Sequence, residues 1–170
     1  MTYTFEDEIP ADIPTAPLLI SGADSSSFDG KVFLLVYQNN DCVAVYEIRY
    51  ECHCGPFKVA IQVDNVLAVG HEAHFYLFDI SAGKPLLNLK LSGYFGYLYL
   101  NNNLLYIADA DGITCINKQG EIRWDNHQLG IDGVIIESFT ENKISGTGEW
   151  DPPGGWRKFT IEKETGDFYS

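Results

Sequence analysis

Short runs of apolar and aromatic residues recur along most of the chain, and clusters of Gly, Asn and Asp separate them. No window keeps apolar residues three and four positions apart for long enough to predict a helix. Short apolar runs between turn-forming residues are typical of β-strands. The pattern therefore predicts an all-β fold.

A repeated arrangement of these runs is visible from residue 56 onward. Four strand-like runs (PFKVAIQV, VLAVG, HFYLFDI and PLLNLKL) follow one another between residues 56 and 92, joined by short turns. Similar sets follow over 93–130 and 131–170. Their first strands begin near Phe57, Tyr94 and Asp132, at intervals of 37 and 38 residues. Two nearly equal intervals indicate an internal repeat.

A repeat of this length, built from four short strands, is typical of a β-propeller blade. We therefore expect residues 1–170 to form a single domain, a propeller-like array of three to four four-stranded antiparallel meanders. The blade-like repeats would be 56–92, 93–130 and 131–170, and residues 1–55 would form an atypical first unit or cap. A closed ring, an open fan and a fan completed by a second copy in a homodimer all remain open at this point.

One segment carries a family resemblance. Residues Leu105 to Trp124 resemble a repeat of the quinoprotein-type (pyrroloquinoline-quinone-type) β-propellers, in which an Asp-Gly hairpin precedes an apolar strand and a turn ending in Gly leads to Trp. Residues 74–89 and 159–168 are similar to the same unit without the Trp. The resemblance covers roughly residues 57–170 and implies the blade plan there. Enzymes of that family are long, exported proteins that bind a quinone with calcium, so the resemblance implies no catalytic residue and no cofactor for this short chain.

The Asp-Gly pair of that segment, Asp111-Gly112, predicts a type I′ hairpin turn, because both central positions of such a turn need a positive φ. Together with Asp109 it also spells the first half of a calcium-binding loop. The residues that follow supply neither the further acidic position nor the late Glu that such a loop requires. We interpret Asp109 to Gly112 as a hairpin turn.

The charge of the chain narrows the classes of partner. Eleven Lys and Arg stand against 24 Asp and Glu, a formal net charge of −13. Such a surface repels a phosphate backbone, and the scattered basic residues offer no cluster for an anionic membrane. The composition favours a protein partner, in particular a basic one, over nucleic acid or membrane.

The first residues and the cysteines bear on the compartment. The N-terminal stretch carries acids and prolines where an export signal would carry basic and then apolar residues, so we expect a cytoplasmic protein. The four cysteines are then expected to be reduced thiols rather than a disulfide framework.

The stretch GEWDPPGGW, Gly148 to Trp156, is the most distinctive loop of the sequence. Pro152 and Pro153 restrict the backbone and the two following glycines reverse it, so Trp150 and Trp156 are expected to flank a hairpin mouth and to pack on each other. One interpretation is a structural corner. The other is a recognition surface in which both tryptophans, Asp151 and the two prolines contact a protein partner. A glycosidase-like carboxylate pair of Glu149 and Asp151 would need a pocket around it.

Two further groups of residues are candidates for binding. Tyr97 and Tyr99 alternate along one strand, and they would add to a binding surface if their face is exposed. Cys52 and Cys54, two apart on an expected strand, could bind a metal together with His71 and His74 from a nearby turn. The spacing is not that of known zinc motifs, and small edge cysteines with solvated turn histidines are the alternative interpretation.

The sequence contains no phosphate-binding loop and no nucleophile elbow. We therefore predict a non-enzymatic, acidic protein-interaction module without a cofactor. One alternative is an immunity or inhibitor protein that neutralises a basic toxin or enzyme. A second alternative is a metal-dependent hydrolase or small-ligand binder that uses the Cys and His residues named above.

Overall fold

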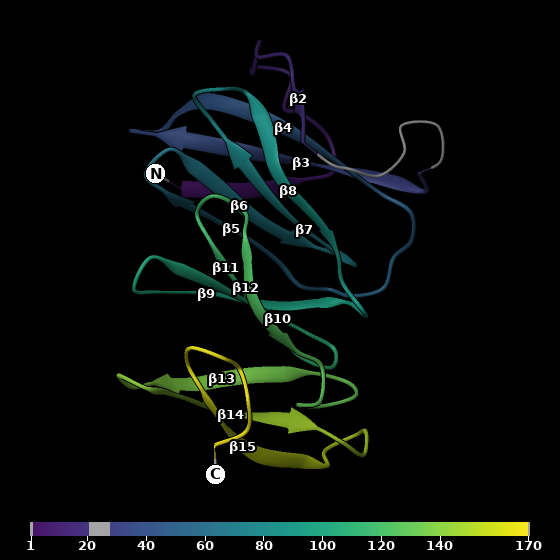
Figure 1. Cartoon of the computed structure of the whole chain (residues 1–170). Coiled ribbons are helices and arrows are strands. Elements are labelled where there is room, and N and C mark those ends of the chain that lie inside the picture. Colours follow the sequence, from purple (N-terminus) through teal and green to yellow (C-terminus); the bar gives the residue numbers. More distant parts are fainter. Residues whose placement is uncertain (1, 21–27, 170) are drawn as a thin grey trace.

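The computed structural model describes residues 2–20 and 28–169. Every regular element of these residues is a β-strand, and the strands form four separate sheets in chain order (Figure 1). The predicted all-β class is confirmed, and so is a propeller-like array of meanders. Within the described residues the array is open, because the first sheet and the last lie at opposite ends of it (Figure 1).

The second and third sheets are four-stranded antiparallel meanders, as the sequence predicts. The second has the order β5-β6-β7-β8 and the third the order β9-β10-β11-β12, written here from one edge to the other. The strands of the second are β5 (Lys58–Val63), β6 (Val66–His71), β7 (His74–Asp79) and β8 (Lys84–Lys90). Those of the third are β9 (Phe95–Asn101), β10 (Leu104–Asp109), β11 (Ile113–Asn117) and β12 (Ile122–Asn126).

The fourth sheet departs from the expected plan, because it has three strands. They are β13 (Val134–Phe139), β14 (Lys143–Glu149) and β15 (Trp156–Glu162), in that order. After β15 the chain turns back through Gly166, whose φ is 76°, and pairs with β15 only through an isolated bridge between Ile161 and Phe168. The fourth strand of this unit is thus reduced to a single bridge.

The first sheet has four strands but is not a meander. Its strands are β1 (Thr2–Glu6), β2 (Leu18–Leu19), β3 (Gly30–Gln38) and β4 (Asp41–Tyr50). Their order is β1-β3-β4-β2, and β2 runs parallel to β4. Neither edge strand follows its neighbour through a hairpin, so this unit differs from the three that come after it.

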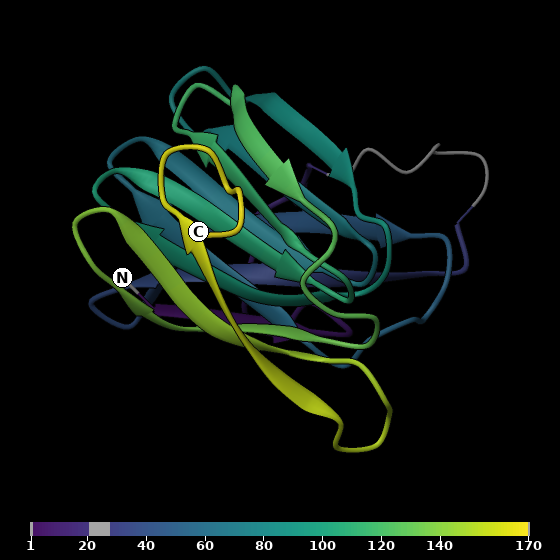
Figure 2. The same cartoon turned by 60° about the horizontal axis from the view of Figure 1, so that its bottom comes forward.

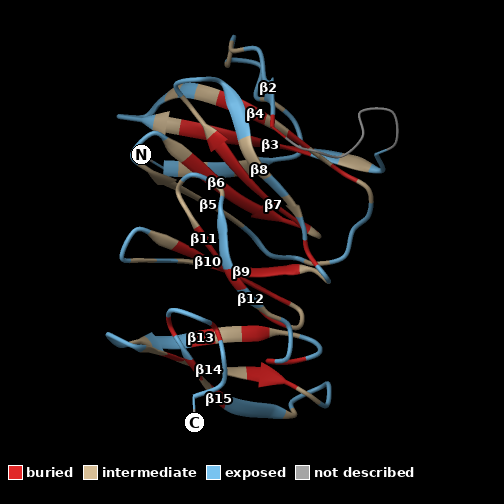
Figure 3. Cartoon of the chain, viewed as in Figure 1, coloured by how far each residue is buried: buried red, intermediate tan, exposed pale blue. Residues whose placement is uncertain are grey.

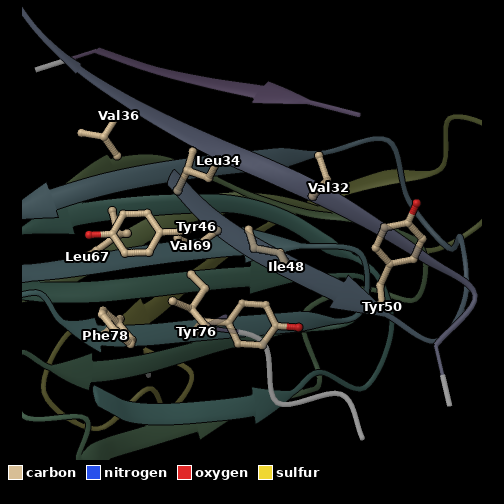
Figure 4. Close-up of a cluster of buried hydrophobic side chains, with 11 residues drawn as sticks. Val32, Leu34, Val36, Tyr46, Ile48, Tyr50, Leu67, Val69, Tyr76 and Phe78 are labelled. Atoms are coloured by element: carbon tan, nitrogen blue, oxygen red, sulfur yellow. The ribbon is translucent and has the colours of Figure 1, made fainter. Parts of the chain in front are cut away.

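Apolar side chains between successive sheets hold the array together. Between the first and second sheets, Leu34 and Ile48 from one side meet Leu67, Val69 and Tyr76 from the other (Figure 4). Burial of a side chain of this size is worth about 1.5–3 kcal/mol. Similar clusters lie between the second and third sheets and between the third and fourth. In these sheets the inner strands β6, β7, β10 and β11 are buried along nearly their whole length (Figure 3).

The two ends of the array are finished differently. The outer face of the first sheet is apolar at Phe33, Leu35 and Val45, and Ile9 and Ile13 of the segment before β2 pack on it. The outer face of the fourth sheet is instead mostly polar, since Ser145, Thr147, Lys158 and Thr160 lie on it, and Trp156 shares this face at the start of β15.

The predicted type I′ turn at Asp111-Gly112 is wrong, because neither residue has a positive φ. The Asp109 carboxylate instead accepts hydrogen bonds from the backbone N–H groups of Asp111 and Gly112, at 3.1 and 2.8 Å. Gly112 is needed for another reason, since a Cβ there would lie 2.2 Å from the carbonyl oxygen of Asn126. Paired positive φ angles occur at Asn102 and Asn103, in the β9–β10 turn.

Candidate binding site

A pocket of about 190 Å³ lies where the first strands of the second, third and fourth sheets begin. Those strands, β5, β9 and β13, are neighbours in the array, with β9 between the other two. Four of the lining side chains are aromatic and two are acidic. The lining residues are Phe57, Tyr94, Gly96, Tyr97, Asp132, Gly133, Val134, Ile135, Glu149 and Trp156.

The internal repeat explains why these residues meet. Phe57, Tyr94 and Asp132 mark the starts of the three repeats, and each stands one or two residues before the first strand of its sheet. Sheets that pack face to face in the same orientation bring such positions together. Three repeats therefore contribute the same position to one pocket.

Phe57 contacts two of the other aromatic side chains of the pocket, and three of the four remain accessible. The Phe57 ring lies 6.2 Å from Tyr94 and 5.5 Å from Tyr97, measured between ring centroids. Phe57, Tyr97 and Trp156 are 37%, 38% and 42% exposed. Large apolar side chains gathered at this exposure present an apolar surface to a ligand.

Gly133 separates two walls of the pocket. A Cβ on this residue would lie 3.3 Å from Cη2 of Trp156 and 3.4 Å from the Tyr94 hydroxyl oxygen. That hydroxyl donates a 2.5 Å hydrogen bond to the carbonyl oxygen of Asp132. Burial of the phenol and the nearby Asp132 raise the pKa of Tyr94 to about 12, so Tyr94 is a neutral hydrogen-bond donor at physiological pH.

Glu149 supplies a carboxylate at the end of β14, opposite Trp156 in the register of β14 and β15. The residue is only 9% exposed. Its Oε1 accepts a hydrogen bond from the backbone N–H of Gly154, the one side-chain hydrogen bond that the described residues make with it. Glu149 is thus a lining residue of the pocket whose second carboxylate oxygen has no hydrogen-bond partner among the described residues.

The loop predicted as a corner or a recognition surface divides between two places. Trp156 lines the aromatic pocket, whereas Trp150 lines a separate open hollow with Asp111 and His127. The expected packing of the two tryptophans on each other does not occur, since the strands carry them to different sides. The hydrogen-bond register of the hairpin explains this, because the backbone N–H of Trp150 donates to the carbonyl oxygen of Gly155. Trp150 is therefore not paired directly with Trp156.

The tip of that loop does not line the pocket. Asp151, Pro152 and Pro153 are exposed at the end of the β14–β15 hairpin, which extends beyond the neighbouring strands (Figure 2). Within the described residues, none of these three side chains lines the aromatic pocket. The tip is a turn beside the candidate site.

The two tyrosines of β9 also have different surroundings. Tyr97 lines the pocket, as a binding role would require. Tyr99 packs against Phe139 beside the core, and its hydroxyl accepts a hydrogen bond from the Ile136 N–H at 3.1 Å. Tyr99 therefore fastens β9 to β13 and does not contribute to the exposed surface of the pocket.

The four predicted metal ligands do not converge. Cys52 and Cys54 lie in the exposed segment between β4 and β5 rather than on a strand. His71 and His74 are buried at the ends of β6 and β7, where His71 packs on Tyr50 and His74 stacks on Tyr76. The solvated-turn interpretation of the histidines is therefore wrong.

The turn between β6 and β7 explains where the cysteine segment lies. Glu72 is buried there, and its carboxylate accepts hydrogen bonds from the backbone N–H groups of Cys54 and Gly55, at 2.7 and 3.1 Å. Neighbouring His53 bonds to the same carboxylate at 3.1 Å. The polar contacts of the segment thus serve to anchor it.

In the described part of the chain, three potential metal-ligand side chains come together at Asp109, Asp111 and His127, with ligand atoms within 4.8 Å of one another. His127 Nδ1 lies 2.8 Å from Asp111 Oδ1. The Ser92 hydroxyl oxygen lies 3.2 Å from Asp109 Oδ2 and 2.7 Å from Asp111 Oδ1, so its one proton bonds to one carboxylate or is shared between the two. These contacts, with the backbone N–H groups that bond to Asp109 Oδ1, engage both oxygens of Asp109 and Oδ1 of Asp111 in support of the hairpin, and they agree with the interpretation of Asp109 to Gly112 as a turn.

Sequence reasoning missed Phe57, Tyr94 and Glu149 as members of one site. The signal was present in the repeat itself, because Phe57 and Tyr94 mark equivalent positions. Glu149 was considered only as half of a carboxylate pair with Asp151, which the structure leaves at the loop tip.

The sequence was compared with models of known protein families and with curated proteins, and neither comparison gave a match. The resemblance to quinoprotein-type repeats thus stays a prediction. Among the described residues there is no helix long and apolar enough to cross a membrane.

Proposed function

We propose that this protein is a non-catalytic binding module whose aromatic pocket docks onto a basic protein partner. The observation that carries the proposal is the convergence of exposed Phe57, Tyr97 and Trp156 beside the buried carboxylate of Glu149. Aromatic residues in a pocket with a hydrogen-bonding partner nearby are typical anchors of protein interfaces.

The charge of the chain supports a basic partner. A net charge of −13 draws a positively charged protein toward the surface and raises its rate of association at low ionic strength. The pocket is also negatively charged, because its two charged lining residues, Asp132 and Glu149, are acidic.

The size of the pocket favours a side chain over a free ligand. Sites for cofactors and small molecules usually measure about 300–1,000 Å³ and bury most of the ligand. A volume of about 190 Å³ accommodates the end of one side chain presented by a larger surface.

The test is a capture experiment with matched variants. The wild-type protein, a Trp156→Ala/Tyr97→Ala variant and an Ile122→Ala variant are immobilised and exposed to native lysate at low and at high salt. Ile122 is a suitable control because it is 46% exposed on β12 and does not line the pocket. Circular dichroism confirms that all three are folded.

The proposal predicts a basic protein that the wild type and Ile122→Ala capture at low salt, that high salt releases, and that the double variant fails to capture. Equal capture by the double variant would show that the pocket is not the docking surface. Capture of an acidic protein that survives high salt would contradict the electrostatic part of the proposal.

A further inference from the structure

The composition of the aromatic pocket distinguishes among basic side chains. An ammonium group is compact and strongly hydrated, and it needs three acceptors to replace its water. A guanidinium group is planar, weakly hydrated and stacks on aromatic faces. Four aromatic side chains line the pocket beside its two acidic residues, and their flat faces suit the second chemistry better than the first.

The acceptors that are present fit a fork of N–H donors. Glu149 has one carboxylate oxygen engaged by Gly154, and its other oxygen makes no hydrogen bond within the described residues. Asp132 places a second carboxylate at the same pocket, exposed to solvent. Two carboxylates beside aromatic rings match a group that carries five N–H donors and a flat apolar face.

The burial of Glu149 strengthens the pairing of its carboxylate with a cation in the pocket. Glu149 is 9% exposed, so a cation that reaches it is partly removed from water. An ion pair and a cation–π contact are both worth more when they are desolvated than on an open surface. Within the described residues no basic side chain lines the pocket, so nothing in the chain itself neutralises this carboxylate there.

We infer that the aromatic pocket receives a single arginine side chain of the partner, with its guanidinium against Trp156 and Tyr97 and its charge paired with Glu149. The inference rests on the proposed function, because it names the side chain through which a basic partner would dock. A trimethylated lysine, which a purely aromatic cage would prefer, is the main competing occupant.

The test uses four short Gly-Ser peptides that differ at one central residue: arginine, citrulline, lysine and trimethyllysine. Each is titrated into the ¹⁵N-labelled full-length protein, and the indole N–H signals of the tryptophans are followed by NMR. Citrulline has the shape of arginine without its charge, and the lysine peptide has the charge without the planar group. Trp156→Phe identifies the signal of Trp156.

We expect the arginine peptide to shift the Trp156 signal with an affinity at least about tenfold higher than the citrulline and lysine peptides show, as a desolvated ion pair with stacking would give. Glu149→Gln should remove most of this preference, because the amide still accepts the Gly154 hydrogen bond but carries no charge. Glu137→Gln is the matched control, since Glu137 is exposed on β13 and does not line the pocket.

Three results would overturn the inference. Equal binding of the lysine and arginine peptides at Trp156 would leave a basic docking site without arginine selectivity, so the proposed function would survive. Tightest binding of the trimethyllysine peptide would assign a methylated ammonium instead. Absence of any Trp156 shift with all four peptides would remove the pocket as a cation site, and the capture experiment would then decide the proposed function separately.

Discussion

Gly133 lies against Trp156 so closely that a Cβ on the glycine would be 3.3 Å from Cη2 of the indole ring. The same glycine has a φ of 141°, a conformation that side chains with a Cβ rarely adopt. Gly133 lies between Trp156 and the Tyr94 hydroxyl. A single methyl group added at this glycine would therefore change the shape of the pocket without changing its polar groups.

Gly133→Ala should therefore weaken binding of the arginine peptide, because the added methyl group narrows the pocket. It should also lower the free energy of unfolding by about 1–3 kcal/mol, because alanine is strained at this φ. Titration calorimetry and urea unfolding measure the two effects. Gly83→Ala is the control, since Gly83 also has a positive φ but a Cβ there would have no atom within 4 Å. Unchanged peptide affinity in Gly133→Ala would show that the ligand does not occupy this part of the pocket.

Trp124 joins the third sheet to the chain that follows the last strand. Its indole N–H donates a buried 3.0 Å hydrogen bond to the carbonyl of Lys163, and its ring packs 6.0 Å from Tyr106. Trp124→Phe should lower the free energy of unfolding by about 1–3 kcal/mol, because the buried carbonyl loses its donor. Trp150→Phe, at a partly exposed position, should have a much smaller effect. Similar urea midpoints for both variants would contradict this role of Trp124.

His71 should make stability depend on pH. Burial lowers its pKa to about 4, and the charges of Lys58, His53 and His74 act in the same direction, against Glu72. Because the folded state holds the neutral ring, this contribution is complete above the ordinary histidine pKa of about 6.5 and is lost as the pH falls from there toward 4. The full loss amounts to about 3 kcal/mol.

Urea unfolding at a series of pH values measures this loss. His71→Gln should reduce the slope of stability against pH within that window. Some slope should remain, because burial also lowers the pKa of His74. An unchanged slope in His71→Gln would mean that His71 is not the group responsible.

His127 should titrate in the opposite direction. Burial alone would lower its pKa, but the hydrogen bond to Asp111 and the charges of Asp109, Asp111 and Asp125 outweigh it, so the pKa is raised. Its stabilising effect is therefore present below the ordinary histidine pKa and is lost as the pH rises through the raised value. NMR titration of the imidazole signals should place His127 above His71 in pKa, and Asp111→Asn should bring His127 down. A His127 pKa below the ordinary value would refute the ion pair.

The strands were predictable from the sequence because their determinants are local. Alternating and continuous apolar runs between turn residues located β5 to β12, and the repeat interval ordered them into meanders. The Asp111-Gly112 turn type was not predictable from that dipeptide, since the Asp109 side chain and the close approach of Asn126 determine its conformation. A side-chain contact from Asp109 and the packing against β12 replaced the preference of the dipeptide there.

The candidate site was predictable only in parts, for the same reason. Tyr97 and Trp156 could be named as exposed aromatic candidates, but their meeting with Phe57 depends on how three sheets pack. The Cys and His residues looked like a metal site because they are close in sequence. Glu72 anchors the cysteine segment, while both histidines turn into the core, and neither event leaves a signal in the sequence pattern.

The measurement that most directly tests the central claim is the NMR titration of the wild-type protein with the arginine peptide at low salt, read at the three tryptophan indole signals. A pocket that docks a basic side chain predicts a saturable shift of Trp156, no shift of buried Trp124, and loss of the shift at high salt. A shift of Trp150 alone, or no shift of Trp156 at saturating peptide, would contradict the account.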